Sequence, residues 1–230
     1  LIAQMLMLLP VGLFDPPAAL LHNLSLMQGY FFSALGAYGL AWYFWRKSAA
    51  ACVAGLIYGF ASYRVIQAGH IQLIHGQFLP LAILGFELAV RSRGRRGAWL
   101  LAGAALAQWL TSWYWAVFSF YWLMPYFLVR LWTWRARLNA AAVARIFYPL
   151  VLACVAIVPL ALPYLDLKER MIMVRPRAMT RPWWARPADF ITPSPRSLLW
   201  GWAGGALRTA GNPERYLFPG LAALAGVAGA

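Results

Sequence analysis

The sequence predicts an all-α protein: a polytopic transmembrane helix bundle with about six to seven spans and a Pro/Arg-rich segment outside the membrane. Hydrophobic residues make up 63% of the chain and charged residues 11%, against roughly half and a quarter in soluble domains. The apolar residues also form long blocks, several close to the ~20 residues that cross the hydrocarbon of a bilayer. A soluble core of this size could not bury so much apolar surface.

The formal net charge of +14 is distributed between the apolar blocks rather than along helix faces. This placement favours anionic lipid head groups or phosphate-bearing ligands as partners, and we expect contact with the lipid bilayer and no nucleic acid. The two cysteines, Cys52 and Cys154, fall inside predicted helices with no spacing typical of a disulfide framework or a metal site, and we expect them to pack there.

Three regions are expected: a transmembrane helix bundle over residues 1–165, an extracytoplasmic Pro/Arg-rich loop segment over 166–216, and the start of a further, truncated transmembrane helix over 217–230. The chain opens at Leu1 without a methionine and stops in LAALAGVAGA, an apolar run too short to span a bilayer. We therefore interpret the sequence as a fragment of a longer protein.

The first helices follow from the breaks between them. Residues 1–14 form a short apolar run, either the tail of a spanning helix or a helix at the surface. The sequence Asp15-Pro16-Pro17 ends it, because proline lacks the helical N–H donor. We expect Asp15 to cap the next helix, with a role as general base as the alternative. Residues 18–45 form the clearest span, with a close-packing face of small residues four apart: Gly29, Ser33, Ala37 and Ala41.

A second span from residue 48 repeats this small face at Ala51, Gly55 and Gly59, and another apolar run covers 79–90. Between them lies the polar stretch, residues 63–78, which we expect to emerge on one side of the membrane. Further along, Glu87 and Arg91 are four residues apart and are predicted to form a local ion pair at the membrane boundary.

The polar stretch holds a set of cationic, imidazole and amide side chains and no acid: Arg64, Gln67, His70, Gln72, His75 and Gln77. On one helix His70 and His75 would lie about 140° apart, so only a broken loop could aim both at one ligand. Metal-binding histidines on a helix prefer an i, i+4 spacing. We therefore assign no metal ligand, and a purely structural role for the histidines stays open.

The later spans are expected over 98–110, 113–129 and 146–165. The aromatic cluster WLTSWYWAVFSFYW is typical of a membrane belt, with a sugar-stacking platform as the alternative. Three prolines, Pro149, Pro159 and Pro163, should kink or end the last of these spans. The segment 166–216 contains many X-Pro pairs, which favour extended chain over long helices.

The orientation follows from the charges of the short loops. One side collects Arg46, Lys47, the arginines of 91–96 and those of 130–145, whereas the short loops of the other side hold only Arg64. The positive-inside rule places the first set in the cytoplasm. Residues 63–78 and 166–216 are then extracytoplasmic.

This outer face concentrates cations that have few matching acids: Arg64, His70, His75, Arg170, Arg175, Arg177, Arg181, Arg186 and Arg196, together with Trp183 and Trp184. Arginine binds phosphate bidentately, and histidine can donate to it. We expect a lipid-linked phosphate or pyrophosphate to be bound by Arg64, His70, His75, Arg175, Arg177 and Arg181. The alternative is that these arginines only meet lipid head groups.

The order of these parts resembles a known family. LFDPPAALLHN leads into SALGAYGLAWYFWRK, and ACVAGLIYGFASYR leads into AGHIQLIHGQFLPLAILGFELAVR. Over residues 15–91 the chain resembles bacterial multi-pass proteins related to the C-type (GT-C fold) glycosyltransferases, the group of the aminoarabinose transferases and protein mannosyltransferases. The nearest likeness is to a poorly characterised branch with a stretch like PYRxxxxGHxQxxxxQWLPL, which here reads SYRVIQAGHIQLIHGQFLPL. ADFITPSP and NPERYLFPG add support.

The resemblance implies an enzyme of the bacterial inner membrane that moves a sugar from a polyprenyl-phosphate donor to an acceptor at the outer face. It also implies a catalytic acid, as base or metal ligand, in the first outer loop. We expect that acid upstream of Leu1, with Asp15 as a weak substitute and a divalent cation as a conceivable cofactor. Arg64, His70 and Gln77 match the family stretch, which implies roles in binding the donor phosphate or lining the cavity.

Two other classes of function stay open: a non-enzymatic transporter or lipid-handling protein, and a structural membrane subunit that assembles through its small-residue faces. Paired broken helices in two homologous halves would favour transport, and the sequence shows no such repeat.

Overall fold

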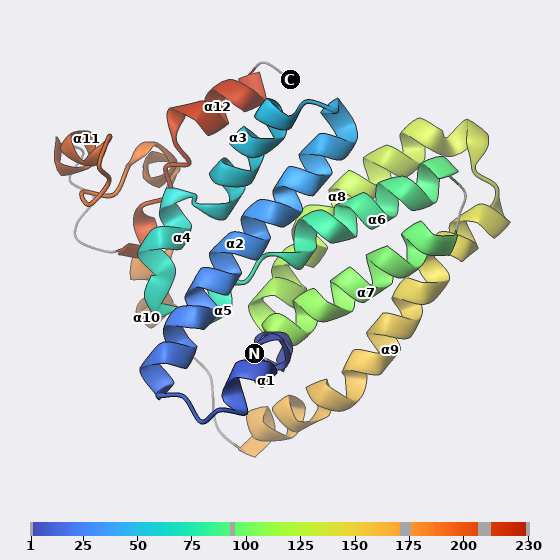
Figure 1. Cartoon of the computed structure of the whole chain (residues 1–230), viewed down its shortest axis with the longest axis horizontal. Helices are drawn as coiled ribbons and strands as arrows, with labels where there is room; N and C mark the ends of the chain where they lie inside the picture. Colours follow the sequence, from blue (N-terminus) through green and yellow to red (C-terminus); the bar gives the residue numbers. More distant parts are fainter. Residues whose placement is uncertain (1, 93–94, 171–175, 207–212, 229–230) are drawn as a thin grey trace.

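The computed structural model describes residues 2–92, 95–170, 176–206 and 213–228, and the regular elements in these ranges are all helices (Figure 1). Three helical segments are long and apolar enough to cross a membrane: Ser48–Gly69, Ile71–Ser92 and Ala140–Pro163. The prediction of an all-α chain with membrane-spanning helices is therefore confirmed at this level.

The first layer is a helical hairpin of α2 (Ala18–Trp45) and α3 (Ser48–Gly59), preceded by α1 (Ile2–Gly12). The residues of both predicted small faces are buried: Gly29, Ser33, Ala37 and Ala41 of α2 and Ala51, Gly55 and Gly59 of α3. The two faces do not meet each other, since Gly29 lies against Ile74 and His75 of the polar stretch. A Cβ atom on Gly59 would lie 2.6 Å from that of Ala34. Helix α3 therefore approaches α2 closely because Gly55 and Gly59 carry no side chain.

The predicted cap at the start of α2 is not formed. Asp15 is exposed and has a left-handed φ of 48°. The cap position is occupied by Pro17, and no side chain bonds to the first turn. The two prolines alone therefore turn the chain into α2. The expected packing role of Cys52 and Cys154 is also wrong, because both side chains are exposed on their helices.

The second layer pairs α6 (Phe78–Ser92) with α7 (Arg95–Thr111), and it rests on two glycines. A Cβ on Gly85 would lie 2.4 Å from the backbone nitrogen of Leu101, and one on Gly97 would lie 2.3 Å from that of Ala89. The backbones of α6 and α7 are therefore in direct contact at this crossing.

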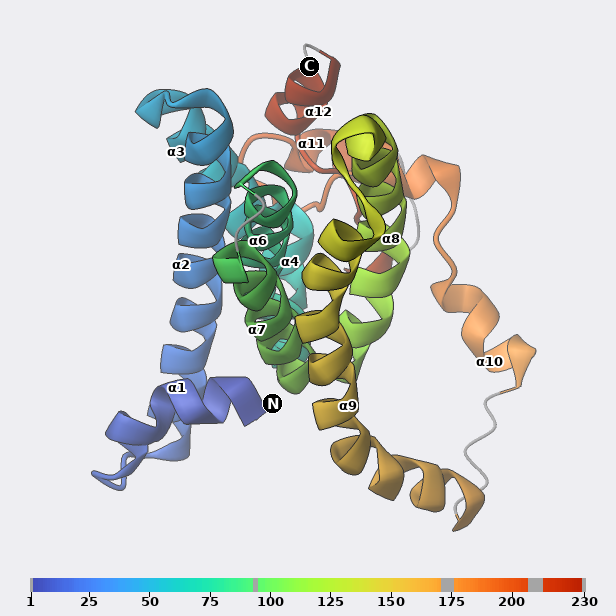
Figure 2. The ribbon, with the colours of Figure 1, turned by 90° about the vertical axis from the view of Figure 1, so that its right-hand side faces the viewer.

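Two further helices, α8 (Trp113–Trp134) and α9 (Ala140–Arg170), pack beside α6 and α7 (Figures 1 and 2). The apolar core lies among these four helices, where Phe86 and Phe127 stack with ring centroids 4.1 Å apart. Helix α9 continues through Pro149, Pro159 and Pro163 to Arg170, beyond the expected boundary at 165, and its lower end turns away from α7 (Figure 2).

The predicted pair of Glu87 and Arg91 is present, with 3.0 Å between Nε and the carboxylate. The sequence did not indicate that Glu87 is fully buried and is shared with α8. Arg130 donates to both carboxylate oxygens, at 2.5 and 2.7 Å, and the Tyr126 hydroxyl donates at 2.6 Å. This charged cluster ties α6 to α8.

After the end of α9 at Arg170, the described part of the Pro/Arg-rich segment contains only short helical pieces, as the proline pattern predicts. The α-helical ones are α10 (Arg177–Thr180) and α11 (Gly201–Ala206), and α12 (Leu221–Ala228) follows. In Figure 1 these orange and red pieces lie on the same side of the bundle as α4.

Candidate functional site

The polar stretch is a broken chain of short helices rather than a single helix. It comprises α4 (Ser62–Ile66), a 3₁₀ turn (Gln67–Gly69) and α5 (Ile71–Ile74). Residues three apart share a helix face, and Arg64 and Gln67 accordingly both point into the bundle, where they are 8% and 2% exposed. Ser62, Val65 and Ile66 lie on the opposite face of α4.

The inner face of α4 holds a buried cation that is bound by the protein itself. The Arg64 guanidinium donates from Nη1 to the Tyr58 carbonyl at 3.0 Å and from Nη2 to the Ser33 hydroxyl at 2.8 Å. Nη2 also donates to the Ile74 carbonyl. Among the described residues no carboxylate forms an ion pair with Arg64.

The position of two of its acceptor carbonyls explains why the Arg64 guanidinium is buried here. Tyr58 lies in the last turn of α3, and Ile74 is the last residue of α5. The final carbonyls of a helix have no partner within that helix, so one guanidinium satisfies the ends of both. The rings of Tyr30 and Tyr58 lie 5.9 and 5.4 Å from its central carbon, which adds cation–π attraction. Arg64 therefore joins α2, α3 and α5 around α4.

His75 is a second buried polar residue with several hydrogen-bond partners. Its Nδ1 lies 3.2 Å from the side-chain nitrogen of Gln77, and its Nε2 lies 3.0 Å from the Ser25 hydroxyl. An amide nitrogen can only donate, so Nδ1 accepts, and Nε2 carries the proton of a neutral ring. The His75 carbonyl accepts from Gln108 of α7 at 2.7 Å. Both ring nitrogens of His75 are thus bonded to the protein.

His70 lies in a different environment. It is exposed, and its Nδ1 lies 2.6 Å from the side-chain oxygen of Gln67. The break in the chain therefore does not direct His70 and His75 to one ligand. Gln77, 2% exposed, bonds to His75 and contacts the Met7 sulfur at 3.8 Å.

The depth of this polar centre follows from its partners on α2. At ~1.5 Å per residue, Ser25 and Ser33 lie about 10 and 22 Å along the helix from Ala18. Arg64 is therefore packed against the middle of α2 and His75 against its first third, and the exposed residues of the stretch include Val65 and His70. Arg64, Gln67, His75 and Gln77 are thus buried in the protein, and the position of residues 63–78 relative to the membrane stays a prediction.

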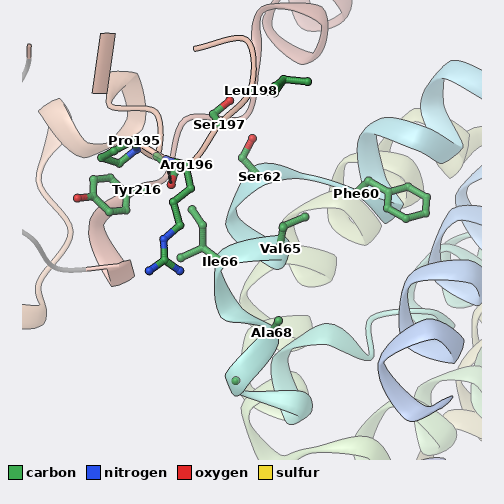
Figure 3. A pocket seen from close by; sticks show the side chains of 12 residues that line it. Phe60, Ser62, Val65, Ile66, Ala68, Pro195, Arg196, Ser197, Leu198 and Tyr216 are labelled. Carbon is green, nitrogen blue, oxygen red and sulfur yellow. Dashed lines mark hydrogen bonds between the residues drawn. The ribbon is translucent and has the colours of Figure 1, made fainter. Parts of the chain in front are cut away.

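The outer face of α4 lines a cavity of about 690 Å³, which we call the α4 cavity (Figure 3). Ser62, Val65 and Ile66 form one wall. Residues 194–198, here named the Arg196 loop, form the other wall with Tyr216. The two segments that the sequence assigns to a common outer face therefore adjoin one another at this cavity.

Arg196 is the charged residue of the α4 cavity, and no acidic residue is among its described lining. In Figure 3 the Arg196 side chain extends past Ile66, while Ser62, Ser197 and Leu198 lie at the other end of the view from the guanidinium. The Ser194 oxygen accepts the Arg196 backbone N–H at 3.1 Å, and the Ser197 oxygen accepts that of Trp200 at 3.4 Å. Each serine keeps its own O–H as a donor.

The Arg196 loop is held from behind by close backbone packing. A Cβ on Gly201 would lie 2.5 Å from the Pro195 carbonyl oxygen, and one on Gly204 would lie 2.3 Å from that of Pro193. Helix α11 can therefore rest directly on the loop only because it carries glycine at these positions.

An ion pair between Asp189 and Arg215 joins the chain before the Arg196 loop to the chain after α11. The buried Asp189 carboxylate accepts Nε and Nη2 of Arg215 at 3.0 and 2.9 Å and the backbone N–H of Arg186 at 2.7 Å. The Arg215 guanidinium, followed by the Arg186 N–H, holds the pKa of Asp189 below its usual range. ADFITPSP and NPERYLFPG, far apart in sequence, are thus joined.

The rim of the α4 cavity is apolar and exposed. Leu198 is 99% exposed, and Phe60 is 52% exposed on the opposite wall. Beside the cavity Leu199 and Trp202 are also exposed, at 71% and 75%. Large exposed apolar groups next to a cation suit an amphiphilic ligand or a membrane surface.

The remaining predicted site residues lie away from the α4 cavity. Arg177 and Arg181 are exposed at the start and end of α10 and do not line it, and Arg175 falls outside the described residues. Arg196 is the cation that the cavity contains. In the sequence it differs from its neighbours only in the serines around it, in the run SPRS.

Within the described part of the chain, no group of three or more His, Cys, Asp or Glu side chains could hold a metal ion. No family model, no curated protein and no solved structure matches this chain.

Proposed function

We propose that this protein is a multi-pass glycosyltransferase of the bacterial inner membrane that takes a sugar from a polyprenyl-phosphate donor and binds the lipid phosphate in the α4 cavity. The observation that carries the proposal is the Arg196 guanidinium in an acid-free cavity with serine hydroxyls and an apolar rim. The sequence resemblance over residues 15–91 supplies the class of reaction.

The membrane arrangement is part of this proposal. Beyond the three candidate spans, the proposal counts α2, α7 and α8, which are 28, 17 and 22 residues long, as spans as well. The α4 cavity and the Pro/Arg-rich segment then face the extracytoplasmic side, because the arginine-rich short loops lie at the other end.

The chemistry of the α4 cavity suits the leaving group of such a transfer. The acceptor oxygen attacks the anomeric carbon, and the bond between that carbon and the phosphate oxygen breaks with its electron pair on the phosphate. The guanidinium of Arg196 and the O–H groups of Ser62 and Ser197 would stabilise the charge that develops there. The proton of the acceptor passes to a base, which the resemblance places in the first outer loop.

Arg64 has a different role in this proposal from the one its sequence position implies. Its Nη1 and Nη2 groups are bonded to carbonyls of α3 and α5 and to Ser33 of α2, so Arg64 holds α4 in place while the opposite face of α4 meets the ligand. Arg196 replaces it as the phosphate-binding residue.

The test uses the full-length protein in detergent micelles with farnesyl phosphate and farnesol as probes, which differ only in the phosphate. We expect Arg196→Gln to weaken farnesyl phosphate binding by about tenfold or more, since it removes a charge-assisted bidentate contact, and to leave farnesol binding unchanged. Arg181→Gln is the matched control, because it removes the same charge from the same segment outside the cavity. Equal losses in both variants would overturn the assignment of the phosphate to Arg196.

A second arm measures release of free polyprenyl phosphate from lipid-linked glycans in proteoliposomes. Release that depends on Arg196 supports the transferase. A specific observation favours a second candidate, a non-catalytic lipid-handling protein: no carboxylate that could serve as a general base is among the described residues lining the α4 cavity. Phosphate-dependent binding without release would support that function instead.

A further inference from the structure

A second cavity, of about 550 Å³, lies where α7 and α9 begin, and we call it the α7/α9 cavity. Figure 1 shows the starts of these two helices beside each other, on the opposite side of the bundle from α4. Helix α7 contributes Arg95, Ala98 and Trp99, and α9 contributes Ala144, Arg145 and Tyr148. Neither the proposed transfer reaction nor the polar stretch uses this cavity.

The α7/α9 cavity carries two cations on two different helices. Arg95 is the first residue of α7, and Arg145 lies in the second turn of α9. No acidic residue is among its described lining. Both helices also direct their amino-terminal ends here, so their dipoles add to the positive potential of the two guanidinium groups. The α7/α9 cavity therefore has a positive electrostatic potential, which attracts anions.

The rest of the wall is suited to hydrocarbon. Trp99 is 53% exposed, and Tyr148 is 61% exposed. Such amphipathic rings gather at the level of lipid head groups. Between them Ala98, buried at 1% exposure, and the small Ala144 leave the cavity open. The α7/α9 cavity thus has cations beside apolar surface, which suits a ligand with a phosphate at one end and acyl chains at the other.

We propose that the α7/α9 cavity binds one anionic phospholipid. Its phosphodiester lies between Arg95 and Arg145, and its glycerol and first acyl carbons lie against Trp99 and Tyr148. The lipid bridges α7 and α9 at their starts and so acts as a structural ligand of the bundle. A phosphodiester suits two guanidinium groups because each can donate to a different pair of its oxygens.

The experiment is native mass spectrometry of the purified full-length protein with phosphatidylglycerol, with phosphatidylcholine as the lipid of zero net charge and inorganic phosphate as a soluble source of the same anion. Each cation near a lipid phosphate contributes ~1 kcal/mol, so Arg95→Gln/Arg145→Gln should weaken phosphatidylglycerol binding by about thirtyfold. The control Arg96→Gln/Arg135→Gln removes the same charge from exposed arginines that do not line the cavity.

A variant that keeps both charges distinguishes binding inside the cavity from general electrostatic attraction of the lipid to the protein. Ala144→Leu fills the cavity and keeps both arginines, and it should also reduce binding of phosphatidylglycerol. Circular dichroism confirms that each variant is folded. Equal weakening by the two double variants would overturn the proposal, as would equal binding of both lipids by the unmodified protein. Displacement of phosphatidylglycerol by an equal concentration of inorganic phosphate would overturn the lipid as occupant.

Discussion

The Arg215 guanidinium meets the Asp189 carboxylate through two parallel contacts, Nη2 to Oδ1 at 2.9 Å and Nε to Oδ2 at 3.0 Å. The two side chains are 10% and 0% exposed. Asp189 also accepts the Leu217 backbone N–H through its own carbonyl, at 3.1 Å. This pair therefore fixes the ends of the chain segment that carries the Arg196 loop.

The first prediction concerns pH. The pKa of Asp189 is lowered, chiefly by Arg215, from an ordinary value of about 3.9. The stabilisation it provides is therefore complete above that ordinary value and is lost as the pH falls through the lower folded-state pKa. We expect hydrogen-exchange protection of the Leu217 amide to be constant from pH 7 to about pH 5 and to decline below about pH 4. Protection factors corrected for intrinsic exchange measure this.

The matched variant is Asp189→Asn, which keeps the shape of the side chain and removes its charge. It should show reduced Leu217 protection at pH 7 and no decline below pH 4. An unchanged acid profile in Asp189→Asn would show that another group controls the segment.

The second prediction compares two ion pairs. Glu87→Gln leaves Arg130, whose side chain is 21% exposed, without its charged partner, and removing one partner of a buried pair typically costs about 3 kcal/mol. Asp166→Asn breaks the exposed i, i+4 pair with Arg170 and should cost less than about 0.5 kcal/mol. Unfolding free energies from titration with a denaturing detergent give both values. Similar losses in the two variants would contradict the structural role of Glu87.

The third prediction concerns Arg64. Arg64→Ala removes the donor to the Tyr58 carbonyl and one of the two donors to the Ile74 carbonyl, which keeps the Gly76 N–H. We expect a loss of about 3 kcal/mol in unfolding free energy from these buried charge-assisted hydrogen bonds. Arg64→Lys should recover little, because one ammonium group cannot reproduce the planar fork. The exposed Arg177→Ala serves as control. If Arg64→Ala were as stable as Arg177→Ala and lost only farnesyl phosphate binding, Arg64 would be a ligand-binding residue after all.

The fourth prediction concerns the crossing of α6 and α7. Gly85→Ala places a Cβ 2.4 Å from the Leu101 backbone nitrogen, and the helices must separate at a cost of roughly 2 kcal/mol. Gly103→Ala meets nothing within 4 Å and should stabilise α7 by up to about 1 kcal/mol. Thermal unfolding in the same detergent measures both. A stabilised Gly85→Ala would show that the two backbones are not in contact.

The sequence predicted the helical bundle and its small-residue faces well, because both depend on local composition and on a four-residue spacing. The Glu87–Arg91 pair was predictable for the same reason. The contacts of Glu87 with Arg130 and Tyr126 were not, since they join helices about forty residues apart in the chain. Likewise, no local pattern connects Asp189 with Arg215.

The site was predicted only at the level of its segments. A run of polar residues indicated that 63–78 is special, but sequence spacing could not tell which face of α4 meets the bundle. Arg64 was therefore assigned to a ligand, although its Nη1 and Nη2 groups are bonded to α2, α3 and α5. Asp15 was expected to cap α2 by its position before proline, yet the left-handed backbone at Asp15 places Pro17 at the cap.

The five residues of α4 separate the buried guanidinium from the cavity wall by a single turn of helix. A displacement of Ser62 or Ile66 toward a ligand would therefore pull Arg64 away from the carbonyls it holds. The α4 wall of the cavity is fixed for this reason. The backbone of the opposite wall, the Arg196 loop, is held by α11, so adaptation to molecules of different size falls to the side chains of that loop, such as the exposed Leu198. Selectivity between ligands should accordingly change with the sequence of residues 194–198 and resist change in α4.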